Sequence, residues 1–167
     1  MAELDELLAK NSGIRLDIGC GANKQDRFVG MDKRELPGVD IVHDWNVYPW
    51  PLPDESCIMV MASHVVEHVN PADGGFLRWM DEVWRICKPG AEFAIAVPHG
   101  YSMGYLQDPT HCNQCNETTW AYFDPDFPLY VIYEPKPWKI RHLVWDPTAN
   151  IELVLVKREV EDVKPGS

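Results

Sequence analysis

Short apolar runs separated by turn signals make up most of the first hundred residues. Four such runs are predicted to be strands: 14–18, 27–31, 40–42 and 57–62. The first (IRLDI) ends at Gly19, and the second (RFVGM) ends at Asp32. The fourth, CIMVMA, is continuously apolar, which is typical of a parallel strand that is covered on both faces.

A helix is predicted next, over Ala72–Cys87, where apolar residues recur at helical spacing before Lys88-Pro89-Gly90 stops them. The run Glu92–Val97 is a further predicted strand. Residues 98–137 are irregular and rich in aromatic residues and prolines, with one short helix expected around Glu117–Phe123.

The last two apolar runs, Lys139–Trp145 and Ile151–Arg158, are expected to be an antiparallel strand pair. Strands that alternate with helices predict the α/β class. We therefore expect a Rossmann-like open, mostly parallel sheet with helices on both faces and an antiparallel last strand.

Composition narrows the classes of function. The 167 residues, 46% of them apolar, suit one domain. The net charge of −11 and the lack of a long basic stripe disfavour a nucleic-acid partner. The start, MAELDELLAK, does not have the pattern of a signal peptide, and no apolar run approaches the ~20 residues that span a bilayer. Five cysteines, an odd number, do not indicate a disulfide framework, so we expect a cytoplasmic protein without membrane association.

The stretch LDIGCGANK, residues 16–24, carries the strongest functional signal. Gly19 and Gly21 allow a sharp turn and the close approach of a ligand. Lys24 stands where the dinucleotide fingerprint has its third glycine, so a pyrophosphate site is poorly supported. Asp17 would instead attract an ammonium or sulfonium group.

Two further carboxylates follow the next strands. Asp32 is placed to accept hydrogen bonds from a ribose diol. Asp44 could accept a hydrogen bond from an adenine amino group, with Trp45 packing on the ring. Each feature also has a purely structural interpretation: the glycines as a tight strand exit, Asp32 as a turn cap, and Asp44 with Asn46 as an Asx-type turn.

Five motifs in order, LDIGCGANK, GMD, HDWNVYPWPLPDES, ASHVVEHV and LRWMDEVWRICKPGAEFAIAVP, cover about residues 14–98. Together they resemble the core of class I S-adenosylmethionine-dependent methyltransferases, in the compact branch whose link between the first two strands is short. DPTH, residues 108–111, and WAYFDP also resemble a segment found in many of these enzymes. The sequence departs from the family at Asn23, where a third glycine is common, and at Cys57, where Asp is frequent.

The resemblance implies S-adenosylmethionine as the cofactor and assigns roles to residues. The cofactor-binding residues would be Asp17, Gly19, Cys20, Gly21, Asp32, Lys33, Asp44, Trp45, Ser63 and His64. In one domain spanning residues 1–167, residues 14–98 would be the cofactor-binding core, 98–137 a lid segment on the substrate side, 138–160 the terminal strand pair, and 161–167 a disordered tail.

Several histidines follow predicted strand ends, where ligands bind in an open α/β sheet. Methyl transfer is an in-line displacement that depends mainly on positioning, and a base is needed only if the acceptor must lose a proton. His64, His99 and His111 are the candidate catalytic bases. Tyr101, Tyr105, Asp108 and His111 are expected on the substrate side.

Two patterns could indicate zinc. His64-x-x-Glu67-His68 has the spacing of an inverted zinc-protease motif, but a strand precedes it and Asn70-Pro71 follows, so the required helix does not fit. The run of His111, Cys112 and Cys115 is only half of a structural zinc site, unless His99 or His142 completes it. We therefore predict no metal ligand.

The sequence thus predicts methyl transfer from S-adenosylmethionine to an oxygen or nitrogen of a small or medium-sized acceptor. An S-adenosylmethionine-binding module without turnover is the main alternative. A zinc-dependent hydrolase that uses His64, Glu67 and His68 is the weaker alternative.

Overall fold

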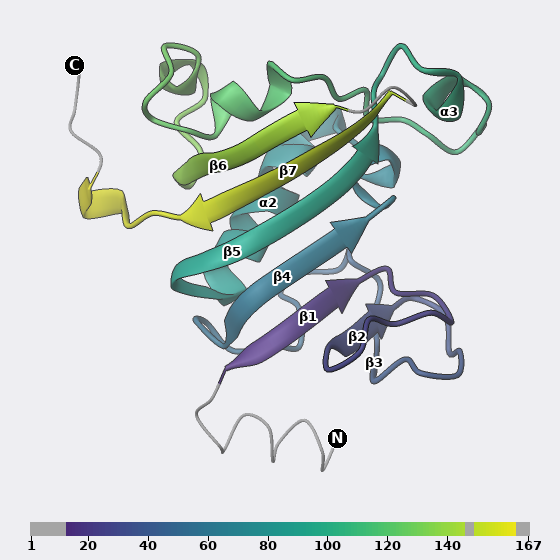
Figure 1. Ribbon diagram of the computed structural model, residues 1–167. Coiled ribbons are helices and arrows are strands. Elements are labelled where there is room, and N and C mark those ends of the chain that lie inside the picture. Colours follow the sequence, from purple (N-terminus) through teal and green to yellow (C-terminus); the bar gives the residue numbers. More distant parts are fainter. Residues whose placement is uncertain (1–12, 146–148, 163–167) are drawn as a thin grey trace.

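The computed structural model describes residues 13–145 and 149–162 of the chain. Seven strands form one sheet in the order β3-β2-β1-β4-β5-β7-β6 (Figure 1). The strands are β1 (Ile14–Ile18), β2 (Val29–Asp32), β3 (Ile41–Val42), β4 (Cys57–Ser63), β5 (Cys87–Pro98), β6 (Trp138–Trp145) and β7 (Asn150–Lys157). The helices are α2 (Gly75–Ile86) and α3 (Met103–Leu106), with 3-10 turns η1 (Val66–His68), η2 (Ala72–Gly74), η3 (Thr119–Tyr122), η4 (Tyr130–Ile132) and η5 (Val160–Asp162).

The pairing of the strands confirms the predicted fold class. Strands β3, β2, β1, β4 and β5 run parallel to one another, whereas β7 is antiparallel to both β5 and β6. Strand β7 alternates as its sequence predicts, with Ile151, Leu153 and Leu155 buried. The fold is therefore a mostly parallel Rossmann-like sheet with an antiparallel end.

Two predicted boundaries differ from the observed ones by three residues or more, for local backbone reasons. The helix was expected from Ala72, but Asp73 (φ 53°) and Gly74 (φ 72°) have left-handed conformations, so α2 begins only at Gly75. Strand β5 begins at Cys87 rather than Glu92. Its pairing with β4 passes from Cys87 to Glu92 through a bulge that contains the expected stop signal, Lys88-Pro89-Gly90.

Helix α2 covers one face of the sheet (Figure 1). Its residues Trp79, Met80, Val83 and Ile86 are fully buried against that face. Within residues 13–145 and 149–162, α2 is the only α-helix longer than four residues, so the expected second helical layer is not seen there. The reason is that the links 19–28 and 33–40 are loops, each shorter than the dozen or so residues of a usual helical crossover.

The segment 98–137 packs closely on the rest of the molecule. Trp120 and Phe123 are buried and belong to the main core, and Tyr130 is buried as well. The predicted helix at 117–123 is present as the shorter 3-10 turn η3.

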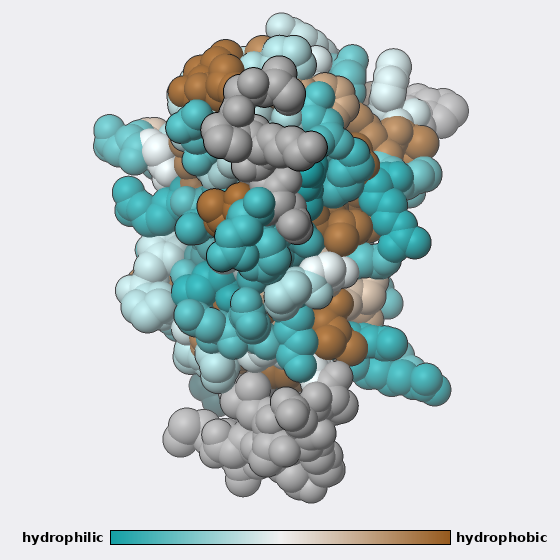
Figure 2. Space-filling model, turned by 90° about the vertical axis from the view of Figure 1, so that its left-hand side faces the viewer, coloured by the Kyte–Doolittle hydropathy of each residue, from teal (hydrophilic) through white to brown (hydrophobic). Residues whose placement is uncertain are grey.

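On the side that lies at the left in Figure 1, hydrophobic side chains form separate patches among hydrophilic ones (Figure 2).

Two expectations concern the ends of the chain. The segment MAELDELLAK and residues 163–167 lie outside the described residues, and the structure places η5 over 160–162, at the start of the predicted tail. None of the helices described for this chain has the length and apolar character needed to cross a membrane.

Candidate active site

A polar pocket of about 410 Å³ lies where β1, β2 and β4 end. It is lined by Gly19, Asp32, Lys33, Arg34, Trp45, Asn46, His64, Val65, His68 and Thr110. Gly19 directly follows β1, Asp32 ends β2, and His64 directly follows β4. The pocket therefore occupies the carboxyl edge of the parallel strands, where open α/β sheets bind ligands.

The glycine turn forms the floor of this pocket. Gly19 (φ 67°) and Gly21 (φ 56°) both have left-handed backbone conformations. The Gly19 N–H donates to the carbonyl of Met31 at 2.7 Å, and a Cβ atom added at Gly19 would lie 2.5 Å from Val65 Cγ2. Because any side chain would both strain the turn and clash, glycine is required at this position.

Asp32 is buried and is held in place from two sides. Its Oδ2 accepts a hydrogen bond from the Gly21 N–H at 3.0 Å, while Oδ1 accepts two from Arg34, through the backbone N–H at 2.9 Å and Nε at 3.2 Å. A carboxylate can accept about four hydrogen bonds, so Asp32 retains capacity on Oδ2 for a ligand hydroxyl. Asp32 therefore caps the turn, as its structural interpretation predicts, and it can also accept a hydrogen bond from a ligand.

The ionisation of Asp32 suits this role. Burial alone would raise its pKa, but the hydrogen bonds from Arg34 and Gly21 and the charge of Arg34 outweigh burial, and the pKa of Asp32 lies below its usual value. The group is therefore a carboxylate, and an acceptor only, at neutral pH.

Asp17 and Asp44, the two other predicted carboxylates, accept hydrogen bonds from nearby loops and do not line the pocket. Asp17 is buried and its Oδ2 accepts a hydrogen bond from the Gln25 N–H at 3.0 Å, which fixes the loop after the glycine turn. Asp44 accepts hydrogen bonds from the backbone and side-chain amides of Asn46 at 2.9 and 3.0 Å, which is the Asx-type turn. Neither lines the pocket, and the neighbouring Trp45 and Asn46 do.

Lys33 and Trp45 form one wall together. The Nζ atom of Lys33 lies 5.7 Å from the Trp45 ring centroid, within the range of a cation–π contact. The indole Nε1 of Trp45 is buried without a hydrogen-bond partner, and the aromatic ring borders the pocket. A flat ligand group could pack against this ring.

Cys20 stands between the two glycines of the turn and does not line the pocket. Burial, together with the carboxylates of Asp17, Asp32 and Asp40, raises the pKa of its thiol to about 11.

Only the thiolate reacts with alkylating reagents, so Cys20 is expected to react about 100-fold more slowly at pH 8 than a free thiol of pKa about 8.5. Its alkylation rate, followed by mass spectrometry of labelled peptides, should keep rising about tenfold per pH unit from pH 7 to 9.5. A plateau by pH 9 would contradict this environment; the exposed Cys112 is the internal reference.

The candidate bases are not all brought together. His64 lines the pocket, has a left-handed backbone (φ 55°), and its exposed ring places Nδ1 3.3 Å from Glu67 Oε1. His99 does not line the pocket, and its Nε2 lies 3.1 Å from Glu117 Oε2. Ser63, expected beside His64, lines a separate hollow over β4, β5 and β7. The structure thus places His64 at the pocket and gives Ser63 and His99 other surroundings.

The substrate-side residues divide in the same way. Tyr101 is 85% exposed and does not line the pocket, whereas Tyr105 is buried against His111, with ring centroids 5.2 Å apart. Asp108 holds Thr110 through Oδ1, at 2.7 Å from the hydroxyl and 2.8 Å from the N–H. Thr110 lines the pocket, so the DPTH segment does reach the site.

Some pocket residues were missed by sequence reasoning: Arg34, Asn46, Val65, His68 and Thr110. His68 and Thr110 belong to motifs that the sequence displays, the H-x-x-E-H spacing and DPTH. The prediction that this stretch does not form the helix of a zinc protease is confirmed. The turn η1 is a single 3-10 turn, and His64 lies outside it. In the half-site with His111, Cys112 is exposed and Cys115 is buried.

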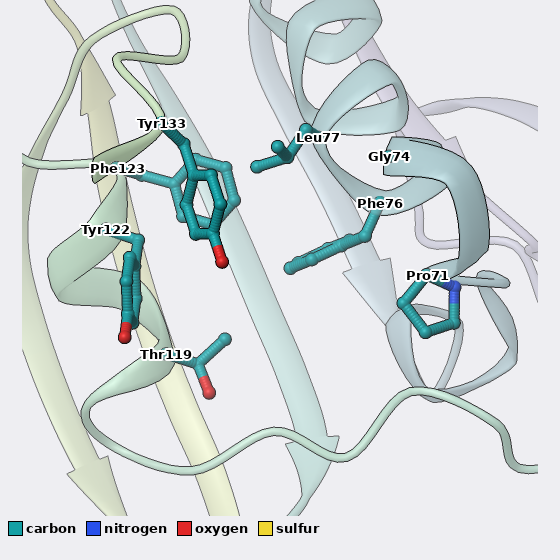
Figure 3. A pocket seen from close by; sticks show the side chains of 8 residues that line it. All are labelled: Pro71, Gly74, Phe76, Leu77, Thr119, Tyr122, Phe123 and Tyr133. Carbon is teal, nitrogen blue, oxygen red and sulfur yellow. The ribbon is translucent and has the colours of Figure 1, made fainter. Parts of the chain in front are cut away.

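A second pocket of about 430 Å³ is apolar and shares no lining residue with the first. Figure 3 shows Phe76 and Leu77 from α2 facing Phe123 and Tyr133, with Tyr122 and Thr119 beside them. Its walls offer few polar groups, so the polar pocket is the candidate active site.

Comparison with known proteins supports the resemblance seen in the sequence. No protein-family model matches the chain. A probable S-adenosylmethionine-dependent methyltransferase of Mycolicibacterium smegmatis is 28% identical over 122 residues, which are 60% of this chain and 46% of that protein. The chain therefore spans about half the length of this curated relative.

Solved structures share the fold over nearly the whole chain. A SAM-dependent methyltransferase from Archaeoglobus fulgidus has a TM-score of 0.61 and 18% identity, covering 93% of this chain and 92% of the other. An S-adenosylmethionine-dependent methyltransferase from Mesorhizobium loti has a TM-score of 0.60 and 14% identity, covering 94% and 98%. The resemblance to class I S-adenosylmethionine-dependent methyltransferases is thus confirmed, and the chain has their fold.

Proposed function

We propose that this chain, which has the class I methyltransferase fold, transfers a methyl group from S-adenosylmethionine to an oxygen or nitrogen of a small or medium-sized acceptor. The observation that carries the proposal is the polar pocket at the ends of β1, β2 and β4. Its glycine turn, buried carboxylate, aromatic wall and histidine would accept an adenosine at one end and a reacting group at the other.

The residues of the pocket have separate tasks in this proposal. Asp32 would accept hydrogen bonds from the ribose hydroxyls, and Trp45 would pack on the adenine. Gly19 would let the backbone approach the ligand. Bound S-adenosylmethionine would supply an electrophilic sulfonium methyl, and the protein would contribute mainly the alignment of the acceptor with that methyl.

His64 is the best-placed candidate base in this proposal. Its ring is exposed at the pocket rim, and its Nδ1 lies 3.3 Å from Oε1 of the buried Glu67. An acceptor hydroxyl or ammonium could therefore transfer its proton to His64 as the methyl group is transferred. The net charge of −11 favours a small-molecule acceptor over nucleic acid.

Replacing Asp32 with asparagine is expected to weaken binding of S-adenosylmethionine about 10- to 100-fold, because a hydrogen bond to a charged group contributes about 1.5–3 kcal/mol. The affinity would be measured by calorimetric titration. Asp26→Asn is the matched control, since that side chain is 94% exposed and lies outside the pocket wall. Equal affinities for wild type and Asp32→Asn would refute the placement of the ribose.

Turnover separates the enzyme from a binding module. Incubation with methyl-labelled cofactor and fractionated small-molecule extracts should yield a labelled product in at least one fraction. A chain that binds the cofactor and labels no fraction would favour the binding module.

A further inference from the structure

Three potential metal ligands meet beside the polar pocket. Glu67 and His68 come from η1, and His111 comes from the loop after α3. One ligand atom from each of the three lies within 4.8 Å of the other two. His111 is 43 or 44 positions from the other two residues in sequence, so only the folding of the 98–111 segment brings it to them.

Glu67 is a buried carboxylate without a hydrogen-bond partner. The residue is fully buried, and neither Oε1 nor Oε2 accepts a hydrogen bond. The nitrogens near Oε1 are His64 Nδ1 at 3.3 Å and His111 Nε2 at 3.9 Å. Buried charges in proteins are normally hydrogen-bonded, paired or bound to a metal. A cation bound beside Glu67 would offset the cost of burying this carboxylate.

The tautomer of His111 is set by its surroundings. Its Nδ1 lies 2.8 Å from the carbonyl oxygen of Tyr105, which can only accept, so Nδ1 carries the proton. The other ring nitrogen of His111, Nε2, lies 3.9 Å from Glu67 Oε1 and 3.8 Å from Asp108 Oδ2, both carboxylate oxygens. A cation bound at this point would be within reach of all three atoms.

The tautomer of His68 follows from a similar chain of contacts. The Thr110 hydroxyl donates to Asp108 Oδ1 at 2.7 Å, so it can only accept from His68 Nδ1, 3.1 Å away. His68 then also has its lone pair on Nε2. Metal-binding histidines typically donate their other N–H to a carbonyl or a carboxylate-held group in this way, which fixes the ring and tautomer.

We propose that Glu67, His68 and His111 bind one divalent transition-metal ion, with zinc best suited to two imidazoles and a carboxylate. Ligand atoms around tetrahedral zinc are about 3.4 Å apart, given bond lengths of about 2.0–2.2 Å. The His111 Nε2 to Glu67 Oε1 distance of 3.9 Å needs to shorten by only about 0.5 Å. Asp108 or a water molecule would complete the shell.

This site differs from the zinc-protease interpretation of the same motif. That pattern needs His64 and His68 one turn apart on an α-helix, whereas His64 here precedes a 3-10 turn and has a left-handed backbone. His111 takes the place of His64 as the second imidazole. The H-x-x-E-H stretch therefore provides two ligands, Glu67 and His68, and the DPTH segment provides the third.

The site borders the polar pocket, because His68 and Thr110 line it. An open coordination position would face the acceptor end. If the chain is a methyltransferase as proposed, an acceptor hydroxyl bound there would release its proton to water more readily, since bound divalent ions lower the pKa of ligated oxygen groups. This last step rests on the proposed function; the metal site itself does not.

The test is zinc binding by the full chain, with any affinity tag removed and metal stripped with a chelator. Titration with zinc chloride alone should show one equivalent per chain. Glu67→Gln and His68→Asn should each weaken binding roughly 100-fold or more, because even outer-shell partners of a ligand contribute about 10- to 100-fold. His142→Gln on β6, which lies outside the ligand group, should bind zinc as wild type does.

Stoichiometry and spectrum decide the outcome. Cobalt substituted into the site should give visible absorption bands that His68→Asn abolishes while its circular dichroism stays native, which separates a lost ligand from a lost fold. Less than about one-tenth of an equivalent of zinc at saturating metal, or equal affinities of wild type, Glu67→Gln and His68→Asn, would overturn the site.

The same samples separate this inference from the proposed function. Metal-free protein would be titrated with S-adenosylmethionine. Cofactor binding without zinc binding would refute the metal site alone, whereas zinc binding without cofactor binding would refute the methyltransferase proposal and retain the site.

Discussion

Gly19→Ala is expected to weaken the binding of S-adenosylhomocysteine about 100-fold or more. A left-handed conformation costs an alanine about 1–2 kcal/mol, and the new Cβ would lie 2.5 Å from Val65 Cγ2. Relief of that clash must move the turn or Val65, and both border the pocket. Together these effects exceed the roughly 2.8 kcal/mol that corresponds to 100-fold. Calorimetric titration measures the loss directly.

Gly90→Ala is the matched control for this substitution. Gly90 has a similar backbone conformation (φ 74°), and a Cβ added there would meet nothing within 4 Å. It lies in the bulge of β5 and does not line the pocket. Gly90→Ala should therefore reduce stability slightly and leave affinity intact. Equal affinities of the two variants would mean that the glycine turn is not part of the ligand site.

Glu82→Ala is expected to lower the free energy of unfolding by about 3 kcal/mol, within the range for breaking a buried pair. Glu82 is a buried residue, 8% exposed. Its Oε1 accepts hydrogen bonds from the Trp50 N–H at 2.6 Å and from Arg85 Nη2 at 2.7 Å, and its Oε2 accepts one from Arg85 Nε. Removing the carboxylate leaves the buried Trp50 N–H without its acceptor and takes from the Arg85 guanidinium its buried ion-pair partner, although the exposed Asp54 still pairs with it. Urea denaturation with an unchanged slope would give the difference.

Asp54→Ala provides the comparison within the same network. Asp54 also pairs with Arg85, but its side chain is 77% exposed, so the loss should stay below about 1 kcal/mol. An equal loss for the two variants would show that burial of Glu82 is not what makes the network strong. The network matters to the site because the Trp50 indole donates to the Trp45 carbonyl at 3.1 Å, and Trp45 lines the pocket.

The strands were the most predictable part of this chain. The run 14–18 was predicted with its observed boundaries because a buried apolar run ends at a glycine that must turn. The strand 87–98 was less predictable, since a bulge lets its pairing continue through Lys88-Pro89-Gly90, which read as a stop. Local sequence does not show that a neighbouring strand will accept such a bulge.

The sequence predicts which strand end a site residue follows better than it predicts which pocket the side chain lines. Ser63 and His64 are adjacent, yet the alternation of β4 and the left-handed turn at His64 place them in different hollows. His99 follows a strand as predicted but pairs with Glu117. The group of Glu67, His68 and His111 could not be derived from spacing, because it depends on how the irregular segment after β5 folds back.

A structure of the chain with S-adenosylhomocysteine bound would show directly where the cofactor lies. We expect the ribose hydroxyls on Asp32, the adenine against Trp45, and the sulfur directed toward His64 and His68. Ligand in the apolar pocket between α2 and η3, or an empty polar pocket at millimolar ligand, would contradict this placement.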